Sequence, residues 1–285
     1  MERQDFRFFH RLRVRWAEVD MQKIVFNAHY LMYFDTAITD YWRALALPYE
    51  EAMQQLGGEL YLKKAGVEYH RSARFDEQLE VALKYSRTGN SSMVFEGAIF
   101  RGEEWLVGAE LIYVFANPAT QSPLTVPEAL RSLLARFEAG AATVTLKTGD
   151  WLTLGPDAAR VREAVFVQEQ GIAPALEWDE ADHSAQHVVA YNGLGQAIAT
   201  GRLVRHASGV GKIGRVAVHH ALRGSGVGQS IMSALVNEAR QVGEAEVMLY
   251  AQRSAQGFYL RLGFVPRGEP FDEAGIAHIE MFKTL

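Results

Sequence analysis

Two periods of apolar and polar residues organise the first half of the chain. Residues 8–16 alternate, with Leu12 and Val14 between arginines, which predicts a strand with one solvated face. From about 28 to 45, apolar residues recur at helical spacing on a stripe wide enough to predict an enclosed helix. Strand-like runs at short spacing then favour an antiparallel meander, at about 59–71, 77–88, 91–101 and 105–115.

A single very apolar helix beside a long sheet has to be buried by that sheet. Residues 1–138 are therefore predicted to form an α+β domain in which an antiparallel sheet surrounds the long helix, with a short helix at 128–138. The small residues at 139–142 are expected to be a linker, and residues 143–285 a second domain.

The second half alternates strands and helices, which predicts an α/β domain. Its first helix is expected from about Asp157, as the N-cap, to Gln170. Further strands and helices are expected in turn, at about 186–191, 196–205, 211–218, 227–240, 246–251, 254–262, 264–268 and 276–283.

The segment Arg223-Gly-Ser-Gly-Val-Gly228 lies between a predicted strand and a predicted helix. Glycines let the backbone approach an anion without a Cβ in the way, and a helix N-terminus adds partial positive charge. No acidic residue follows at the spacing of a dinucleotide-binding fold, and no Gly-Lys-Ser/Thr closes a P-loop. The segment is interpreted as an anion-binding loop, with a plain Gly-rich connection as the alternative.

Composition narrows the class of protein. The 285 residues, 48% hydrophobic and 22% charged, are typical of a globular chain of two domains. A net charge of −5 gives no basic field for nucleic acid. The lack of cysteine excludes disulfides and thiolate chemistry and fits a cytoplasmic protein. No apolar run has membrane-spanning length, the N-terminus has no apolar signal-peptide region, and no metal is expected.

The first domain resembles the hot-dog fold of the 4-hydroxybenzoyl-CoA thioesterase type. Three segments carry the resemblance, at 13–20, 24–31 and 69–76. Lys23 stands where that family has glycine, and its His-x-Asn is exchanged for Asn27-x-His29. The resemblance implies a homo-oligomer, a dimer or tetramer, formed through this domain.

The same resemblance implies acyl-CoA hydrolysis. Asp20 takes the place of the carboxylate that attacks the thioester or activates water. A backbone N–H near Asn27 takes the place of the oxyanion donor, although Asp20 could equally cap a turn. His29 is either a substrate contact or a packing residue, and Glu18 is expected to be solvated. Arg11, Arg13 and Arg15 could meet CoA phosphates, but a solvated strand face is the simpler interpretation.

The second domain resembles the GNAT acetyltransferases, with a mixed sheet and flanking helices. Arg223, Gly226 and Gly228 fit the R-x-x-G-x-G loop that binds acetyl-CoA, and residues 252–264 resemble a second GNAT motif. The resemblance implies that Val216, Ala217 and Val218 pair with the pantetheine arm. The amides of Gly224, Ser225, Gly226, Val227 and Gly228 would then hold the pyrophosphate, with Arg223 nearby. Tyr259 takes the place of the proton donor to the thiolate, and a buried core tyrosine is the alternative.

An attacking amine must be neutral, so a base or water chain is needed. Glu177, Asp179, His183 and His278 are candidates, although an acidic loop is often only solvated. An unpaired negative pocket here would suit a cationic amine.

These observations favour a bifunctional CoA-thioester enzyme that uses acyl-CoA, acetyl-CoA and a small amine. One alternative is that only the GNAT domain is catalytic and the hot-dog domain binds CoA or forms oligomers. Another is a CoA-binding scaffold without catalysis.

Overall fold

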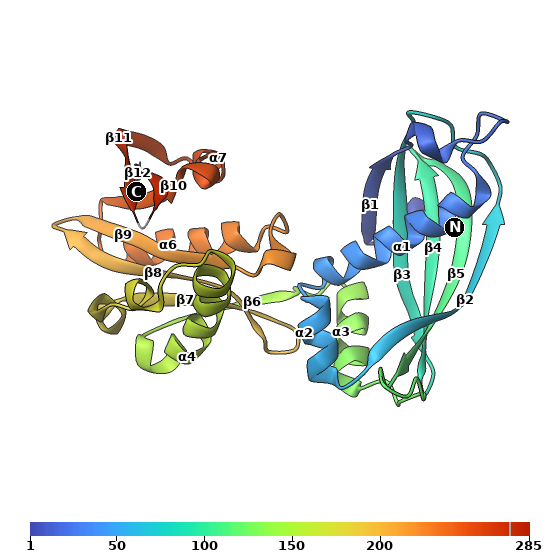
Figure 1. Cartoon of the computed structure of the whole chain (residues 1–285), viewed down its shortest axis with the longest axis horizontal. Coiled ribbons are helices and arrows are strands. Elements are labelled where there is room, and N and C mark those ends of the chain that lie inside the picture. The colour runs from blue at the N-terminus through green and yellow to red at the C-terminus, as the bar shows by residue number, and fades with distance from the viewer. Residues whose placement is uncertain (274) are drawn as a thin grey trace. The chain divides into compact units, whose positions relative to one another are not determined.

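The computed structural model describes residues 1–273 and 275–285, which form two compact units, Met1–Thr143 and Val144–Leu285 (Figure 1). Each unit has a sheet of its own with helices packed on it. No helix of the described residues combines the length and the apolarity needed to cross a membrane.

The N-terminal unit is an antiparallel sheet around a long helix, as predicted. Its strand order is β1-β3-β4-β5-β2. The strands are β1 (Phe8–Arg13), β2 (Glu59–Tyr69), β3 (Gln78–Thr88), β4 (Ser92–Arg101) and β5 (Glu104–Ala116). The helices are α1 (Asn27–Ala44), α2 (Tyr49–Leu56) and α3 (Glu128–Glu138). Figure 1 shows α1 lying along the face of this sheet.

Aromatic residues of α1 fill the space between helix and sheet. Phe34, Tyr41 and Trp42 are each at most 4% exposed, and burying one such side chain is worth about 1.5–3 kcal/mol. Gly97 on β4 makes the close approach possible, because a Cβ there would lie 2.6 Å from Phe34 Cε1. The wide apolar stripe thus predicted the enclosure of this helix correctly.

The expected meander is wrong for its first strand. Only β3, β4 and β5 follow one another across the sheet, whereas β2 pairs with β5 at the far edge. Short spacing suggested that β2 and β3 were neighbours, but the segment between them, 70–77, crosses from one edge of the sheet towards the other. The strand expected at 8–16 also ends early, at Arg13, and Trp16–Glu18 forms a 3₁₀ turn.

The C-terminal unit is a mixed seven-stranded sheet with the order β11-β12-β10-β9-β8-β7-β6. Its strands are β6 (Val144–Gly149), β7 (Gln186–Asn192), β8 (Ala197–Ala207), β9 (Val210–Val218), β10 (Glu246–Gln252), β11 (Val265–Glu273) and β12 (Ile276–Thr284). Its helices are α4 (Trp151–Arg162), α5 (Pro174–Glu177), α6 (Val227–Gln241) and α7 (Gln256–Arg261). A π-helix, η3 (Glu163–Glu169), continues α4, and η4 (Glu180–Ser184) follows α5.

The predicted start of the first helix in this unit is wrong. Helix α4 begins at Trp151, and its N-cap is Asp150, whose side chain accepts a hydrogen bond from Thr153 N at 2.9 Å. Gly155 leaves room for the Trp151 ring, because a Cβ there would lie 2.8 Å from Trp151 Cδ2. The helix therefore passes through Gly155 and Pro156, and Asp157 is not its N-cap but accepts a hydrogen bond from Tyr191.

Candidate active sites

In the N-terminal unit, the loop before α1 folds into a tight turn with Asp20 at its tip. Val19 and Val25 form a β-bridge, and Asp20 N donates to Ile24 O at 2.9 Å. The Asp20 carboxylate is half-buried and accepts a hydrogen bond from Gln22 N at 2.7 Å. Asp20 therefore caps this turn, and only one of its oxygens is engaged in doing so.

Lys23 adopts the conformation that the family's glycine would favour. Its φ is +62°, in the left-handed region that L side chains occupy at a cost of about 1–2 kcal/mol. Its amide donates to Asp20 O at 2.9 Å and so closes the turn. The loop thus has a left-handed turn despite the loss of the glycine.

The N-terminus of α1 offers donors for a developing negative charge. Asn27 is the first helical residue, and its N-cap, Phe26, supplies no side-chain cap. Within the described residues, the amides of Asn27 and Ala28 donate to no acceptor. His29 is half-buried beside the Phe26 ring, at 6.1 Å between centroids. No hydrogen bond of the described chain joins Asp20 to Asn27 or His29.

The expectation that Glu18 is solvated is wrong, because its side chain is buried. It is 2% exposed and accepts hydrogen bonds from Tyr33 Oη at 2.7 Å and Arg15 N at 2.7 Å. Burial acts to raise the pKa of the Glu18 carboxyl, but these hydrogen bonds outweigh it and hold the pKa below its usual value. Glu18 is therefore a buried anchor between the loop and α1.

The three N-terminal arginines have carboxylate partners. Arg11 binds Glu80 at 2.9 Å and Arg13 binds Asp76 at 3.2 Å. Arg15 binds Glu18 at 2.5 Å. This pairing favours the solvated strand face over a phosphate site.

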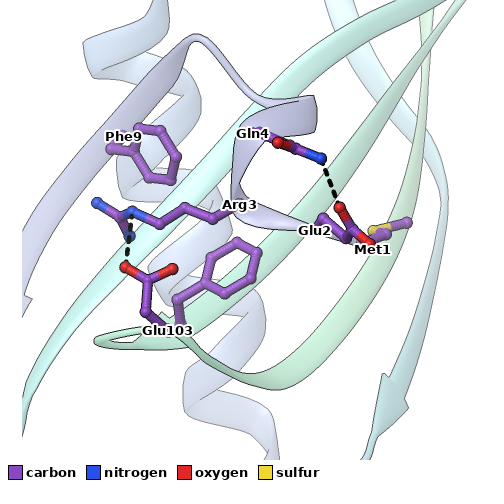
Figure 2. Close-up of a pocket in the computed structure, with 7 residues that line it drawn as sticks. Met1, Glu2, Arg3, Gln4, Phe9 and Glu103 are labelled. Carbon is purple, nitrogen blue, oxygen red and sulfur yellow. Dashed lines mark hydrogen bonds and ion pairs between the residues drawn. The ribbon is translucent and has the colours of Figure 1, made fainter.

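A pocket of about 590 Å³ lies elsewhere on this unit, beside the 3₁₀ turn Arg3–Asp5 (Figure 2). Arg3 points between Phe9 and Glu103, with its Cζ 4.3 Å from the Phe9 ring centroid and its Nε 3.8 Å from a Glu103 oxygen. Its charge is also paired with Glu80. None of the predicted site residues lines this pocket, and we assign it no function.

In the C-terminal unit, β9 and β10 are parallel neighbours that separate. They pair only through three residues each, ending at Lys212 and Met248. A register shift in the pairing of β9 with β8, with Arg215 at φ +52°, accompanies the separation. Ala217 and Val218 still pair with β8 on their other side. Residues 216–218 thus have an edge that β10 does not cover.

The Gly-rich loop follows this open edge and leads into α6. Gly224 and Gly226 have φ of +82° and +91°, which glycine alone adopts readily. Within the described chain, the amides of Gly226, Val227 and Gly228 donate to no acceptor. Ser225 Oγ donates to Leu222 O at 2.6 Å. The geometry is that of an anion site made by backbone amides and a helix N-terminus.

Arg223 lies beside this loop but is already paired. Its two terminal nitrogens each donate to a Glu169 oxygen at 2.6 Å, and its Nε donates to Val218 O at 3.3 Å. The hydrogen bond to Glu169 raises the pKa of Arg223 further. Arg223 therefore tethers η3 to the end of β9, and a neutralised guanidinium adds little charge for a phosphate.

Residues 169–170 reach both of the separating strands, which the sequence did not suggest. Gln170 Oε1 accepts a hydrogen bond from Gln252 Nε2 at 3.0 Å, at the end of β10, while Glu169 holds Arg223 beyond β9. The resemblance of 252–264 to a GNAT motif pointed to this neighbourhood. The partner in η3 is distant in sequence, so only the fold could reveal it.

Tyr259 lies on α7, and its side chain is half-buried. Its ring packs against Phe258 and Phe264, with centroids 5.0 and 6.1 Å away. Its hydroxyl has no hydrogen-bond partner in residues 1–273 and 275–285. Burial raises the pKa of Tyr259 to about 12, so this hydroxyl is protonated at neutral pH.

The acidic loop is not an unpaired negative pocket. Glu177, Asp179 and the neighbouring Asp182 bind three arginines. Arg162, 1% exposed, donates to Glu177 at 2.5 Å and to Asp182 at 2.7 Å. Arg202 and Arg215 complete the network. Arg202 binds Asp179 at 2.6 Å and Asp182 at 2.7 Å. Arg215 binds Asp179 at 3.1 Å and Glu177 at 3.3 Å.

The pKa values of two carboxyl groups in this network, Glu177 and Asp179, are shifted in opposite directions. Burial raises the pKa of Glu177 despite its arginine partners. The hydrogen bond from Arg202 lowers the pKa of Asp179 to about 2.

Of the two histidine candidates, His183 is exposed. His278 is 8% exposed, stacks on Phe271, and its Nδ1 lies 2.7 Å from Ile276 O.

Comparisons with known proteins match each half separately. A family model for the acetyltransferase (GNAT) domain matches residues 155–285, and one for the thioesterase-like superfamily matches residues 14–134. The uncharacterized N-acetyltransferase YjcF of Bacillus subtilis is 39% identical over 128 residues, which cover 45% of this chain and 90% of that protein.

Among the described residues, no three His, Asp or Glu side chains group as a metal site.

Two solved structures illustrate the likenesses. ElaA of Escherichia coli is 29% identical, covers 49% of this chain and 99% of its own, and has a TM-score of 0.45. A 1,4-dihydroxy-2-naphthoyl-CoA thioesterase from Synechocystis is 15% identical, covers 45% of this chain and 95% of its own, and has a TM-score of 0.42. From the family matches and the relative YjcF, the chain belongs to the GNAT acetyltransferases through its C-terminal half and carries a thioesterase-like hot-dog domain in its N-terminal half.

Proposed function

We propose that the protein is a bifunctional CoA-thioester enzyme that transfers an acetyl group from acetyl-CoA to an amine and hydrolyses an acyl-CoA thioester. The observation that carries the proposal is the open edge of β9 at 216–218, which leads directly into a row of unpaired amides at 226–228. An extended pantetheine arm fits such an edge, and a pyrophosphate fits such amides.

In the transferase half, the phosphates lie at the start of α6, so the acyl end of the ligand points back along β9. The neutral amine attacks the thioester carbonyl, whose oxygen accepts a hydrogen bond from a backbone amide of the open edge of β9. As the new C–N bond forms and the C–S bond breaks, Tyr259 gives its proton to the leaving thiolate. Among the candidate bases, the arginine-paired Glu177 and Asp179 are poorly suited, which leaves His183, His278 or water.

In the hydrolase half, Asp20 either takes a proton from the water that attacks the thioester carbonyl, or attacks that carbonyl itself to form an anhydride that water then hydrolyses. On both routes the C–S bond breaks, and CoA leaves as a thiol after its thiolate takes up a proton. The amides of Asn27 and Ala28 stabilise the oxyanion, aided by the dipole of α1. We propose a homo-oligomer through this domain, because several large apolar side chains around the loop are exposed: Trp16 (76%), Met21 (101%), Tyr69 (49%) and Phe75 (52%).

A second candidate is that only the GNAT domain is catalytic. The hydrogen bond from Gln22 N to Asp20 favours it, since this carboxylate already has a structural role. In that case the hot-dog domain binds CoA or forms the oligomer.

The test has two parts. Acetyl-CoA binding is measured by calorimetry, and release of CoA from a panel of acyl-CoAs is followed with a thiol reagent, with and without amines. Release without amine reports hydrolysis, and additional release with amine reports transfer. Absence of binding at millimolar concentration overturns the proposal, while transfer without hydrolysis supports the second candidate.

A further inference from the structure

One row of side chains crosses four neighbouring strands of the C-terminal sheet. Lys212 on β9 lies over the Tyr250 ring of β10, with its Nζ 3.8 Å from the ring centroid. Tyr250 meets Phe271 of β11 edge to face at 5.0 Å, and Phe271 stacks on His278 of β12 at 6.0 Å. The row therefore offers a ligand one positive charge, from Lys212, and an apolar surface made by the rings of Tyr250 and Phe271.

This row shares a face with the arginine–carboxylate network. Val204 of β8 pairs with Lys212, and Arg202 pairs with Gly214, so Lys212 and Arg202 point to the same side of the sheet. On that side, three arginines face three carboxylates and balance them. Lys212 lies on the same side as this balanced network and takes part in none of its ion pairs.

Lys212 has no carboxylate of its own. It is half-buried, and within residues 1–273 and 275–285 no acidic oxygen lies within ion-pair distance of its ammonium. Glu273 and Asp179 act on it only at longer range, against Arg202 and Arg215. Burial lowers the pKa of Lys212.

The position of Lys212 relates it to the acyl group. Lys212 and Met248 are the last paired residues before β9 and β10 separate. The open edge begins four residues further on, at Val216, which is roughly 13 Å along an extended strand. Because the phosphates bind beyond the other end of this edge, Lys212 lies on the side to which the acyl end of the ligand points.

We propose that the acceptor of the acetyl group is an amine that also carries a carboxylate, bound by Lys212 while its apolar part lies along Tyr250 and Phe271. This inference rests on the acetyl transfer proposed above and names its substrate class. A single ammonium beside a balanced network suits a monoanion, so a carboxylate fits better than a doubly charged phosphate. The cationic amine expected from the acidic loop does not fit, because that loop is neutralised.

The test compares amino acids with their amides, with aminophosphonates of matched side chain, and with polyamines as acceptors of acetyl-CoA. The wild-type protein is expected to favour the amino acid over its amide in kcat/KM by about tenfold or more. At a given pH, a larger fraction of the amino acid amide than of the amino acid has a neutral, reactive amine. A preference for the amino acid therefore cannot result from the protonation state of its amine. Lys212→Met is expected to abolish the preference and Lys212→Arg to retain it, with acetyl-CoA affinity unchanged in both.

Lys147→Met is the matched control, because Lys147 of β6 also lies over a tyrosine ring. Its Nζ is 4.8 Å from the ring centroid of Tyr191 on β7. It should leave the acid-to-amide ratio unchanged. If acetyl-CoA does not bind, the proposed function itself fails. If acetyl-CoA binds and the amides, phosphonates or polyamines are equal or better acceptors, only this inference is overturned. Binding without acetylation of any amine contradicts both the inference and the transferase half of the function.

Discussion

Lys23 strains the backbone of its turn without changing the conformation of that turn. Its φ of +62° places an L residue in a left-handed conformation, and the turn that holds Asp20 depends on it. Glycine has no Cβ to clash in this region, but it also loses more freedom on folding. These two effects act in opposite directions at Lys23.

We expect Lys23→Gly to leave the free energy of unfolding unchanged or to raise it by up to about 1 kcal/mol, because relief of about 1–2 kcal/mol of strain exceeds the entropy cost. Urea unfolding checks this. Lys84→Gly, at a regularly paired position of β3 opposite Glu96, is the control and should lose about 0.5–1 kcal/mol. A clear loss of stability in Lys23→Gly would show that the lysine side chain itself holds the turn.

At the phosphate loop, backbone amides rather than Arg223 are expected to hold the ligand. Gly226→Ala forces a Cβ onto a φ of +91°, so it should weaken acetyl-CoA binding by about tenfold. Arg223→Gln should change affinity by less than about threefold, because Glu169 already neutralises this charge. Calorimetry measures both variants.

Gly209→Ala, at φ +73° in the turn between β8 and β9, imposes similar strain away from the loop and should bind normally. Equal losses in Gly226→Ala and Gly209→Ala would mean that strain affects the whole unit and not the ligand site. A large loss in Arg223→Gln would mean that the ligand draws this arginine away from Glu169.

At the scale of elements, the arginine–carboxylate network joins α4, α5, η4, β8 and β9. Asp179, with a folded pKa of about 2, binds protons less readily than in the unfolded chain. Its contribution to stability is therefore complete above about pH 4 and is lost as the pH falls towards about 2. Acid should loosen these elements together.

We expect Asp179→Asn to be less stable than wild type near neutral pH and to lose less stability on acidification from about pH 5 to about pH 3. Thermal unfolding across this range measures the slope. Glu269→Gln, on the exposed β11, removes a carboxylate outside the network and should keep the wild-type slope. Parallel slopes for Asp179→Asn and wild type would contradict the prediction.

Elements with a strong period or a motif were predictable from sequence. The stripe of α1, the strands β3 to β5 and the Gly loop before α6 follow from local pattern. The edge position of β2 and the start of α4 do not, since the first depends on how the chain crosses the sheet and the second on Trp151 packing over Gly155. The burial of Glu18 and the charge balance around Glu177 depend on partners that only the fold brings together.

For the molecule as a whole, the candidate sites lie in two separate units of one chain. If both are active, Asp20→Asn should reduce thioester hydrolysis by at least about a hundredfold and leave acetyl transfer intact, because it removes the nucleophile or base of one site only. Tyr259→Phe should slow transfer and leave hydrolysis intact. The thiol-reagent assay measures both rates in each variant, and loss of both activities in either one would contradict independent sites.

The π-helix η3 ends at the two residues that tether the separating strands. A π turn contains more residues than an α turn. If the same residues wound as an ordinary α-helix, each turn would hold fewer residues, so Glu169 and Gln170 would turn away from Arg223 and Gln252. Both tethers would be released by this change in winding alone, so proteins that share this arrangement should keep the π turn even where the composition of the segment varies.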